Sequence, residues 1–520
     1  MQLSRSIQIK YNTQIKVDIQ NVIEKILMST MLTIMFVHCG DNSLGDLNKN
    51  EFDPADTVST TPWEHEVYLP FDIPPFSVLR ASEKKVYAHY FTQFPISIDN
   101  KDPSSDYYQN GYLSPNGEEG KHLDYGGFLR SRPIPREPIS ASNWKEINMQ
   151  EEVRRAIAVG IDGFACDLLS DKGYHYENTK ILLDAAYLVD PGFKILLMPD
   201  MVAFRDRPDD ITKLILDLAQ HPSALRLEDG RLIVSPYNAQ TQEPDWWKNW
   251  MNTMEDQGEI VALVPLFQGW KNYAASFSPF SYGMSDWGWR SVSGQSYWES
   301  VAQEAKSYGP IWMMPVSPQD MRPKSLRYWE AKNSLQYRIM WENAINGGSD
   351  WVQLITWNDY SEHTMVAPST GTDYSFYDLT AYYTTWFKTG SKPTITRDVI
   401  YYFYRNQKIR LTPKYQSKKF NLDSGSDPAS EQVEVLAFLT EPGILEIEIM
   451  GEVETKPVQS GISSFRIQMK PGRPVFRLRR NDEVIITLPG AFKILSEIDY
   501  QNLLYLGGSN SRVPVMKEVD

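Results

Sequence analysis

The amino-acid sequence predicts an α/β fold: a (β/α)8 TIM barrel followed by a C-terminal antiparallel β-sandwich domain. Short apolar runs alternate with amphipathic helical patterns from about residue 84 to about residue 390, which indicates a parallel sheet covered on both faces. Eight such units over about 300 residues favour a barrel over an open sheet. No GxGxxG motif follows the first run, which argues against a dinucleotide-binding sheet.

The apolar runs give eight strands, which alternate with seven predicted helices. The predicted strands are residues 84–91, 161–169, 193–200, 231–238, 259–267, 280–288, 310–318 and 350–358. The predicted helices are residues 144–160, 179–189, 211–221, 245–258, 297–309, 325–348 and 378–390. The first strand is followed by a long, loop-like connection before its helix, and Gly160 is placed to cap that helix at its C-terminus.

The pattern changes after about residue 396. Residues 432–450 and 465–490 alternate apolar and polar side chains between Pro-Gly turns, which is typical of antiparallel strands. We therefore expect a sandwich of about 120 residues at this end of the chain. The predicted domains are a barrel at 81–395 and a β-sandwich accessory domain at 396–520, after a flexible lead-in at 40–80.

The first 39 residues are interpreted as a signal peptide. Ile26–Val37 is an apolar run too short for a comfortable membrane span, and it ends at His38-Cys39 before a polar stretch. This arrangement resembles a bacterial lipoprotein signal, in which Cys39 would be lipidated. We therefore expect an exported periplasmic or cell-surface lipoprotein of a bacterium, attached to a membrane only through that lipid. The alternative is a buried helix with an ordinary core cysteine.

Composition excludes several classes of function. The net charge is -14 without a basic stripe, so no nucleic-acid partner is expected. Cys39 and Cys166 are the two cysteines, too few for a disulfide framework. The seven histidines show no HExxH or HxH spacing. We expect neither a metal nor a cofactor.

Polar and aromatic side chains follow the predicted strands at the end where barrel enzymes build their sites. The predicted substrate-binding residues are His89, Asp167, Asp200, Tyr237, Asn238, Trp270, Trp287, Trp357, Asn358, Tyr360 and His363. Asp359 and Glu362, three apart after the eighth strand, are the predicted catalytic pair. Carboxylates among Trp and Tyr side chains are typical of glycoside hydrolysis, in which one group protonates the leaving oxygen and the other activates water or attacks carbon.

Purely structural interpretations exist for these residues. Asp359 and Glu362 resemble a helix-capping pair, and Asp167 fits either a cap or the site. Asp200 fits a second catalytic carboxylate or a group that positions a sugar hydroxyl. The tryptophans fit a hydrophobic core as well as a sugar platform, and Cys166 fits inert packing.

Three segments together resemble one known family. WNDYSEH (357–363) resembles the WNDY-x-E signature of family 71 glycoside hydrolases, the α-1,3-glucanases or mutanases. KVYAHYF (85–91) and AIAVGIDGFACDLL (156–169) are similar to the family's first two strands, and FKILLMPDM (193–201) to its third. The resemblance implies an inverting enzyme with Asp359 as the base and Glu362 as the acid. His363 and the insertion at 99–138 depart from the family pattern.

The sequence therefore predicts a glycoside hydrolase that cleaves α-glucan, most readily α-1,3-glucan, with a polysaccharide or oligosaccharide as its partner. One alternative is an endo-α-mannosidase similar to family 99 enzymes, and another is a surface lipoprotein that binds glycan without cutting it. An inverting mechanism requires about 6.5–9.5 Å between the two carboxyl groups, so we expect the side chains of Asp359 and Glu362 to diverge.

Overall fold

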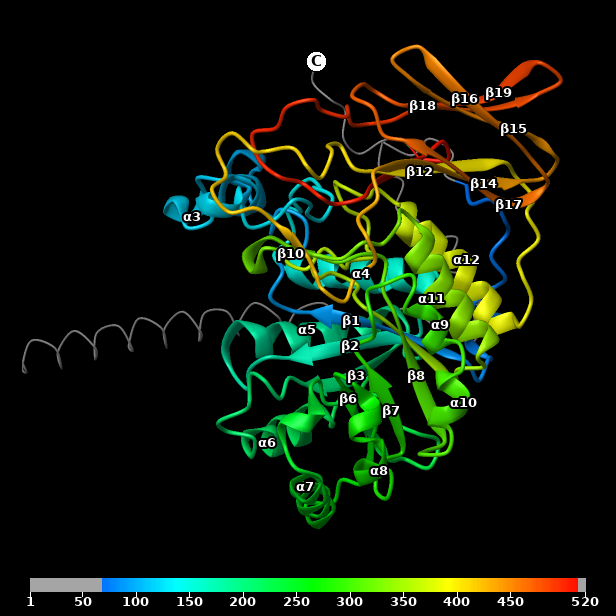
Figure 1. Ribbon diagram of the computed structural model, residues 1–520. Coiled ribbons are helices and arrows are strands. Elements are labelled where there is room, and N and C mark those ends of the chain that lie inside the picture. Colours follow the sequence, from blue (N-terminus) through cyan, green and yellow to red (C-terminus); the bar gives the residue numbers. More distant parts are fainter. Residues whose placement is uncertain (1–67, 513–520) are drawn as a thin grey trace, which may run out of the picture. The chain divides into compact units, whose positions relative to one another are not determined.

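The computed structural model of the protein describes residues 68–512 (Figure 1). Its centre is one curled parallel sheet of nine strands in the order β5-β4-β3-β2-β1-β11-β8-β7-β6. The strands are β1 (Lys85–Phe91), β2 (Gly163–Leu168), β3 (Lys194–Pro199), β4 (Leu232–Val234), β5 (Val261–Leu263), β6 (Leu266–Phe267), β7 (Gly283–Asp286), β8 (Ile311–Val316) and β11 (Trp351–Leu354). Each lies within a range predicted as a strand, with β5 and β6 sharing the fifth range.

The two outermost strands of that order, β5 and β6, are separated in the chain by two residues, Val264 and Pro265. On one side of this segment, the amide of Val264 donates to the carbonyl of Val234 at 2.9 Å. On the other side, the amide of Ser285 donates to the carbonyl of Pro265 at 2.9 Å. The segment is therefore hydrogen-bonded to β4 on one side and to β7 on the other.

Alternate residues of each strand point to opposite faces of the sheet, and both faces are buried. On β1, Val86, Ala88 and Tyr90 join the large outer cluster under the helices, whereas Tyr87 joins the inner cluster. The inner cluster also contains Met198, Trp287 and other apolar residues from the remaining strands. His89 follows Tyr87 by two residues and therefore faces inward as well.

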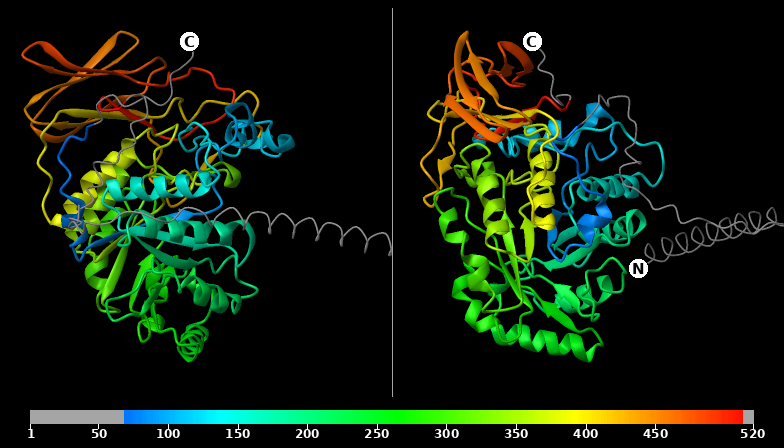
Figure 2. Two further views of the ribbon diagram at one scale, coloured as in Figure 1. Left: turned by 180° about the vertical axis from the view of Figure 1, so that it is seen from behind. Right: turned by 90° about the vertical axis from the view of Figure 1, so that its right-hand side faces the viewer.

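Helices cover the outer face of the sheet (Figures 1 and 2). They are α2 (Phe76–Arg80), α4 (Trp144–Ala158), α5 (Gly173–Val189), α6 (Asp210–Leu218), α7 (Pro244–Asp256), α8 (Ala274–Phe277), α9 (Gln295–Trp298), α10 (Val301–Ala305), α11 (Leu335–Asn346) and α12 (Ser375–Thr389). In α6 the apolar residues Ile211, Leu214, Ile215 and Leu218 lie on one buried face. Gly160 follows α4 with a φ of 78°, a conformation that glycine adopts at low cost, as expected for a helix end.

One predicted helix is wrong over its first ten residues. The sequence suggested a helix at 325–348, but α11 begins at Leu335. The preceding chain forms a small sheet of β9 (Met321–Arg322), β10 (Arg327–Tyr328) and β13 (Asn421–Leu422). Tyr328 is buried in a cluster with Phe420 and Leu504 from the end of the chain, so a partner distant in sequence overrides the local helical pattern. The helix expected at 297–309 is broken into α9 and α10.

The insertion between β1 and α4 folds into short turns over the end of the sheet. It contains η2 (Pro103–Ser105), η3 (Tyr108–Leu113), α3 (Gly117–Gly120) and η4 (Leu123–Tyr125). Tyr108 and Leu129 from this insertion pack with Tyr360 and Met365 from the loop after β11. The buried ion pair between Arg132 and Asp106 ties the insertion together. This packing holds the loop that carries the WNDYSEH motif.

The C-terminal part consists of antiparallel strands, as predicted. One sheet has the order β17-β14-β12-β20 and the other β16-β15-β18-β19. The strands are β12 (Val399–Tyr404), β14 (Gln432–Leu439), β15 (Gly443–Ile449), β16 (Glu452–Val458), β17 (Gly461–Gln468), β18 (Val475–Arg480), β19 (Glu483–Pro489) and β20 (Leu506–Ser509). One hydrophobic cluster contains residues of both sheets. Side chains on the other face of β12 and β14 pack with those of α12, which is therefore buried along nearly its whole length.

The predicted signal peptide and Cys39 lie outside the described residues. Among residues 68–512, no helix is long and apolar enough to span a membrane.

Candidate active site

His89, Asp167 and Gln353 form a buried chain of hydrogen bonds at the inner face of the sheet. His89 Nε2 lies 2.9 Å from Asp167 Oδ2, and the Gln353 amide nitrogen lies 3.1 Å from His89 Nδ1. Because the amide donates to Nδ1, the ring proton sits on Nε2 and is donated to Asp167. Burial lowers the pKa of His89 to about 4. The ring is therefore neutral at physiological pH and holds the Asp167 carboxyl in one orientation.

Asp167 itself is buried at the end of β2 and has unused hydrogen-bonding capacity. Its Oδ1 has no hydrogen-bond partner among residues 68–512. Burial raises the pKa of the Asp167 carboxyl well above its usual range, and the charge of Asp359 adds to the effect. The two carboxyl groups are thus close enough to influence each other's ionisation.

Asp359 lies in the loop that leaves β11, where local hydrogen bonds fix its side chain. Its Oδ1 accepts from the amide and hydroxyl of Ser361, at 2.8 and 2.7 Å, and from the amide of Glu362 at 3.0 Å. The Asp359 amide donates to Thr356 Oγ1 at 2.7 Å. Burial raises the pKa of Asp359, while these donors and the charge of Arg322 oppose the rise. The capping geometry expected for Asp359 is present, and it fixes the carboxylate within the site.

Glu362 is held by a cation from the neighbouring strand connection. Arg322 lies 2.7 Å from Glu362 Oε1, and its other nitrogens bind both oxygens of the buried Asp320 at 2.8 and 2.6 Å. Arg290, also buried, lies 3.5 Å from Asp320. Glu362 Oε2 has no partner among the described residues. Burial raises the pKa of Glu362 well above its usual range; the charge of Asp359 adds to this and Arg322 opposes it.

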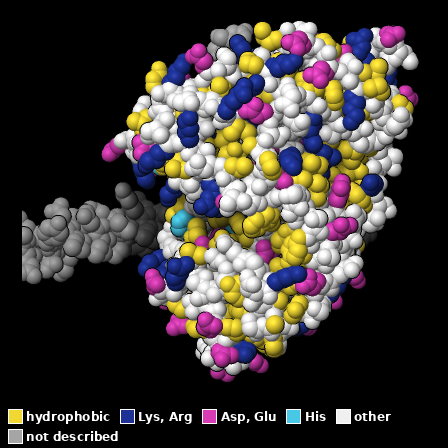
Figure 3. All heavy atoms as spheres, viewed as in Figure 1, with side chains coloured by type: hydrophobic (Ala, Val, Ile, Leu, Met, Phe, Trp, Pro, Cys, Tyr) yellow, Lys and Arg dark blue, Asp and Glu magenta, His cyan; other side chains and the backbone are white. Residues whose placement is uncertain are grey.

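Aromatic rings lie beside the carboxyl groups. The Trp287 ring centroid is 4.9 Å from that of Tyr237 and 5.1 Å from that of His89. Burial raises the pKa of Tyr237, and the charges of Glu362, Asp167 and Asp200 raise it further. Figure 3 shows a recess on the molecular surface with acidic and hydrophobic side chains gathered around it.

Asp200 directly follows β3 and is partly exposed. Its Oδ1 accepts from the amides of Val202 and Ala203 at 2.7 and 3.1 Å. Burial and the nearby Asp167 raise the pKa of Asp200 to about 6. The structure therefore brings together seven of the thirteen predicted catalytic and substrate-binding residues: His89, Asp167, Asp200, Tyr237, Trp287, Asp359 and Glu362.

Two predicted tryptophans lie in the outer core and do not join the cluster of carboxyl groups. Trp357 is fully buried and donates from its indole nitrogen to Glu152 on α4 at 2.9 Å. Trp270 is equally buried and packs on Trp312, with ring centroids 5.0 Å apart. Asn238 adopts a φ of 58° directly before the short helix η5 (Ala239–Thr241), and its side-chain oxygen accepts from the Gln240 amide. These positions give the three side chains structural partners.

The residues next to the predicted catalytic pair in sequence also form structural contacts. Asn358 exchanges two hydrogen bonds of 2.8 Å with the backbone of Phe91. Tyr360 is buried in the aromatic cluster formed with the insertion. His363 accepts from the Arg130 amide at 2.8 Å and donates to the Met321 carbonyl at 2.7 Å. Burial lowers the pKa of His363 to about 3, so it serves as a neutral bridge between loops.

Sequence reasoning missed four residues around the predicted site: Gln353, which binds His89, and Arg322, Asp320 and Arg290, which form an ion-pair network beside Glu362. Gln268 was noted at the end of the fifth predicted strand but was not assigned to the site. Gln353 lies within β11 and reads as an ordinary strand residue. Gln268 Nε2 donates to the Tyr237 hydroxyl at 3.1 Å. Asp320 and Arg322 stand directly after the seventh predicted strand, in PVSPQDMR (315–322). An acidic and a basic residue at that strand end could have been recognised from the sequence as candidate site residues.

A chain that places two differently held carboxyl groups beside aromatic rings, at the ends of parallel strands, has the layout of a glycoside hydrolase. The family model described as glycosyl hydrolase family 71 matches residues 139–511. The protein therefore belongs to glycosyl hydrolase family 71 and is a glycoside hydrolase.

Curated relatives agree with this assignment. A glucan endo-1,3-alpha-glucosidase of Schizosaccharomyces pombe is 26% identical over 369 residues, covering 66% of this chain and 85% of the relative. A mutanase of Penicillium rubens is 22% identical over 397 residues, covering 71% and 85%. A solved structure, the GH99 endo-alpha-mannosidase from Bacteroides thetaiotaomicron, is 17% identical with a TM-score of 0.45, covering 58% of this chain and 97% of that one.

The predicted localisation is wrong. The sequence suggested a periplasmic or cell-surface lipoprotein of a bacterium, with Cys39 as the lipidated residue. The curated relatives are fungal proteins, including an ascus wall endo-1,3-alpha-glucanase of Schizosaccharomyces pombe that is 19% identical over 393 residues. They point to a eukaryote, in which a bacterial lipoprotein signal has no role.

Proposed function

We propose that the protein hydrolyses α-1,3-glucan by an inverting mechanism in which Glu362 is the general acid and Asp359 the general base. The observation that carries this proposal is that Asp359 and Glu362 lie on one loop in different surroundings. Three hydrogen-bond donors converge on Asp359 Oδ1, whereas burial and the charge of Asp359 raise the pKa of Glu362 against the opposing charge of Arg322. The linkage rests on the names of the two most similar curated relatives described above.

The division of roles follows from the surroundings of each carboxyl group. Three donors converge on Asp359 Oδ1 and favour its charged form. Glu362 has one buried oxygen without a partner, and the nearby charge of Asp359 disfavours a second negative charge. Arg322 opposes this, but its charge is shared with Asp320 through two hydrogen bonds. One carboxylate and one carboxylic acid are the pair that hydrolysis requires.

The reaction then proceeds in one displacement. Glu362 donates its proton to the glycosidic oxygen as the bond from that oxygen to the anomeric carbon breaks. Asp359 takes a proton from the water that forms the new bond on the opposite face of the ring. The two residues end with exchanged protonation states, and proton exchange with solvent restores them.

The remaining residues of the cluster bind the sugar. Asp167 Oδ1, which has no partner among residues 68–512, is placed to accept a sugar hydroxyl, and His89 holds Asp167 in position. Tyr237 and Trp287 offer ring faces and edges for stacking. One carboxylate oxygen of Asp200 accepts hydrogen bonds from backbone amides of its own turn, so we assign Asp200 to substrate positioning.

We further propose that the parallel sheet is a closed (β/α)8 barrel over residues 81–395. Support comes from β5 and β6, which are consecutive pieces of chain bonded to opposite ends of the sheet order. The two C-terminal sheets share one hydrophobic cluster, which supports a β-sandwich over residues 396–520. The apolar run at 26–37 is proposed to direct export, with residues 40–80 as a lead-in to the barrel that ends in α2.

Purified α-1,3-glucan and α-mannan, incubated separately with the protein, test the proposed substrate. We expect reducing ends to be released from the glucan and not from the mannan. Asp359→Asn and Glu362→Gln should each lower kcat by about 10²–10⁴-fold, because each removes a proton-transfer step. Release from mannan alone, or retained glucan hydrolysis by both variants, contradicts the proposal.

A further inference from the structure

Trp289 is a half-exposed tryptophan in the loop that follows β7. It is 48% exposed, whereas tryptophan side chains are on average largely buried. Two residues earlier in the same loop, Trp287 packs on His89 in the active site. The next residue after Trp289, Arg290, is buried 3.5 Å from Asp320. Trp289 therefore offers an open indole ring in a loop whose neighbouring residues belong to the active site.

The indole ring of Trp289 is held in one position although it is exposed. Its Nε1 donates to the Gly425 carbonyl at 3.1 Å. A Cβ atom at Gly425 would overlap the ring, and one at Gly294 would lie 2.7 Å from Trp289 Cδ1. Gly294 has a φ of -70°, which any residue adopts, so the ring rather than the backbone requires a glycine there. A ring fixed before binding loses little conformational entropy when a ligand stacks on it.

Residues 423–427, between β13 and β14, join the loop after β7 to the hairpin of β9 and β10. Asp427 Oδ2 accepts from the Ser293 amide in that loop at 3.0 Å. Asp423 pairs with Arg327 on β10 at 3.3 Å. Three segments that are distant in sequence thus form one wall.

This wall continues to the carboxyl group of Glu362. Arg322 on β9 is paired with Arg327 on β10 in the register of the hairpin, and Arg322 lies 2.7 Å from Glu362 Oε1. The Arg322 guanidinium also lies 4.9 Å from the centroid of the partly buried Trp329 ring. The wall that carries Trp289 therefore also carries the direct ion-pair partner of Glu362.

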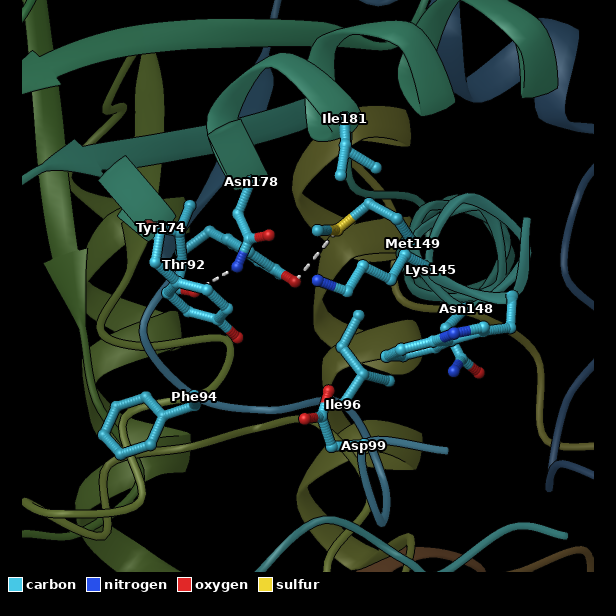
Figure 4. A pocket seen from close by; sticks show the side chains of 12 residues that line it. Thr92, Phe94, Ile96, Asp99, Lys145, Asn148, Met149, Tyr174, Asn178 and Ile181 are labelled. Atoms are coloured by element: carbon cyan, nitrogen blue, oxygen red, sulfur yellow. Dashed lines mark hydrogen bonds between the residues drawn. The ribbon is translucent and has the colours of Figure 1, made fainter. Parts of the chain in front are cut away.

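The enclosed cavity between the end of β1 and the first turns of α4 and α5 does not offer a comparable place for a sugar (Figure 4). Its volume is about 30 Å³, room for a water molecule or two, whereas small-ligand sites enclose about 300–1,000 Å³. Figure 4 shows Asn178 in its wall bonded to Thr92, at 3.1 Å from the carboxamide nitrogen to the Thr92 carbonyl. A sugar ring needs an open surface such as that of Trp289.

We infer that Trp289 is a stacking platform for a sugar unit in the leaving half of the glucan chain, the half on the reducing-end side of the cleaved bond. The inference rests on the proposed function for the identity of the sugar and for the role of Glu362. A general acid protonates the oxygen of the leaving group, so the leaving half lies on the Glu362 side of the site. An indole ring stacks on flat apolar surfaces such as one face of a pyranose. Trp289 binds substrate without contacting the reacting bond, and it favours cleavage within a chain over cleavage at its reducing end.

Binding of α-1,3-linked oligosaccharides of increasing length tests the platform, with all variants made on the Glu362→Gln background to prevent hydrolysis. Trp289→Ala should weaken the binding of the longer oligosaccharides about 3- to 10-fold and leave that of the disaccharide unchanged, because a short ligand at the reacting centre does not reach the ring. Trp289→Phe keeps an aromatic face and should restore part of the loss. Unchanged binding of every oligosaccharide to Trp289→Ala overturns the inference.

Tyr187→Ala is the matched control. Tyr187 is 46% exposed and stands in the last turn of α5, at the edge of the sheet opposite to the ends of the strands that carry the active site. Its removal should change the binding of no oligosaccharide. Gly425→Ala is an independent variant, because it displaces the Trp289 ring without removing it. It should weaken the binding of the longer oligosaccharides as Trp289→Ala does.

The position of cleavage tests which half of the chain lies on Trp289. In the active protein, oligosaccharides labelled at the reducing end report which bond is cut. Loss of a platform on the leaving side removes the advantage of placing sugar units there, so Trp289→Ala should move cleavage toward the labelled end. Cleavage that stays at the same bond, or moves toward the other end, overturns the assignment to the leaving half.

Failure of the platform and failure of the proposed function give different results. If binding depends on Trp289 for α-mannan oligosaccharides and not for α-1,3-linked ones, and α-1,3-glucan is not hydrolysed, the platform is supported and the proposed substrate is rejected. If α-1,3-glucan is hydrolysed and its oligosaccharides bind equally well to Trp289→Ala, the platform alone is rejected.

Discussion

Replacing Arg322 with methionine should move the alkaline limb of the pH–activity profile to higher pH. Arg322 lies 2.7 Å from Glu362 Oε1 in an ion pair, and loss of this positive charge raises the pKa of Glu362. An opposite charge within about 4–6 Å shifts the ionisation of a carboxyl group by about 1–3 pH units. A general acid acts only while protonated, so activity should persist to a pH higher by the same amount.

The assay is kcat/KM on soluble α-1,3-linked oligosaccharides as a function of pH. Arg327→Met is the matched control. The Arg327 guanidinium lies 5.8 Å from the centroid of the Trp329 ring, and Arg327 pairs with Asp423 rather than with Glu362. It should leave both limbs unchanged. Arg322→Lys keeps the charge and should shift the alkaline limb less than Arg322→Met does.

The two limbs distinguish the roles of the carboxyl groups. Arg322 also lowers the pKa of Asp359, so the acid limb should move upward as well, but by less, because Arg322 contacts Glu362 directly. If Glu362 were the base, the larger movement would be that of the acid limb, because a base acts only when deprotonated. If neither limb moved in a folded Arg322→Met protein, the ion pair would not control Glu362. Either result would refute the reasoning above.

Three further predictions concern the surrounding residues. Trp357→Phe should lower the free energy of unfolding, measured by urea titration, by about 1–3 kcal/mol and leave kcat unchanged, because it leaves the buried Glu152 without its indole donor. A large loss of kcat would instead place Trp357 in the site. Acidification from pH 6.5 to about 4 should lower the free energy of unfolding of the wild type by roughly 3 kcal/mol more than that of His363→Gln. In this pH range the histidine of the unfolded chain takes up a proton, whereas the buried ring, with a pKa of about 3, does not. Equal losses of unfolding free energy in the two proteins would contradict a buried neutral His363. Asp200→Asn should raise KM more than it lowers kcat, and a kcat loss as large as that of Asp359→Asn would make Asp200 catalytic.

The sequence predicted the strands of the central sheet well because a buried parallel strand is apolar on both faces and leaves a continuous signal. The same signal located His89, Asp167 and Asp359 at strand ends. It failed for residues 325–334, where Tyr328 is buried against the distant Phe420 and Leu504. A local helical pattern carries no information about such partners.

Proximity in sequence was a poor guide to proximity in space around the catalytic pair. Trp357, Asn358 and Tyr360 flank Asp359, yet each points to a different structural partner. Successive side chains in a loop leaving a strand diverge, so only some of them face the site. Conversely, Arg322 lies 40 positions before Glu362 in the chain. It reaches Glu362 because the backbone of β9 is hydrogen-bonded to the loop: the Met321 amide donates to the Glu362 carbonyl at 2.9 Å.

Time-resolved proton NMR of the first sugar released from α-1,3-linked oligosaccharides tests the central claim most directly. If Asp359 activates water on the face opposite the bond that Glu362 protonates, the β-anomer appears first and then mutarotates. Initial release of the α-anomer would show retention and would contradict the assignment of these two residues as base and acid.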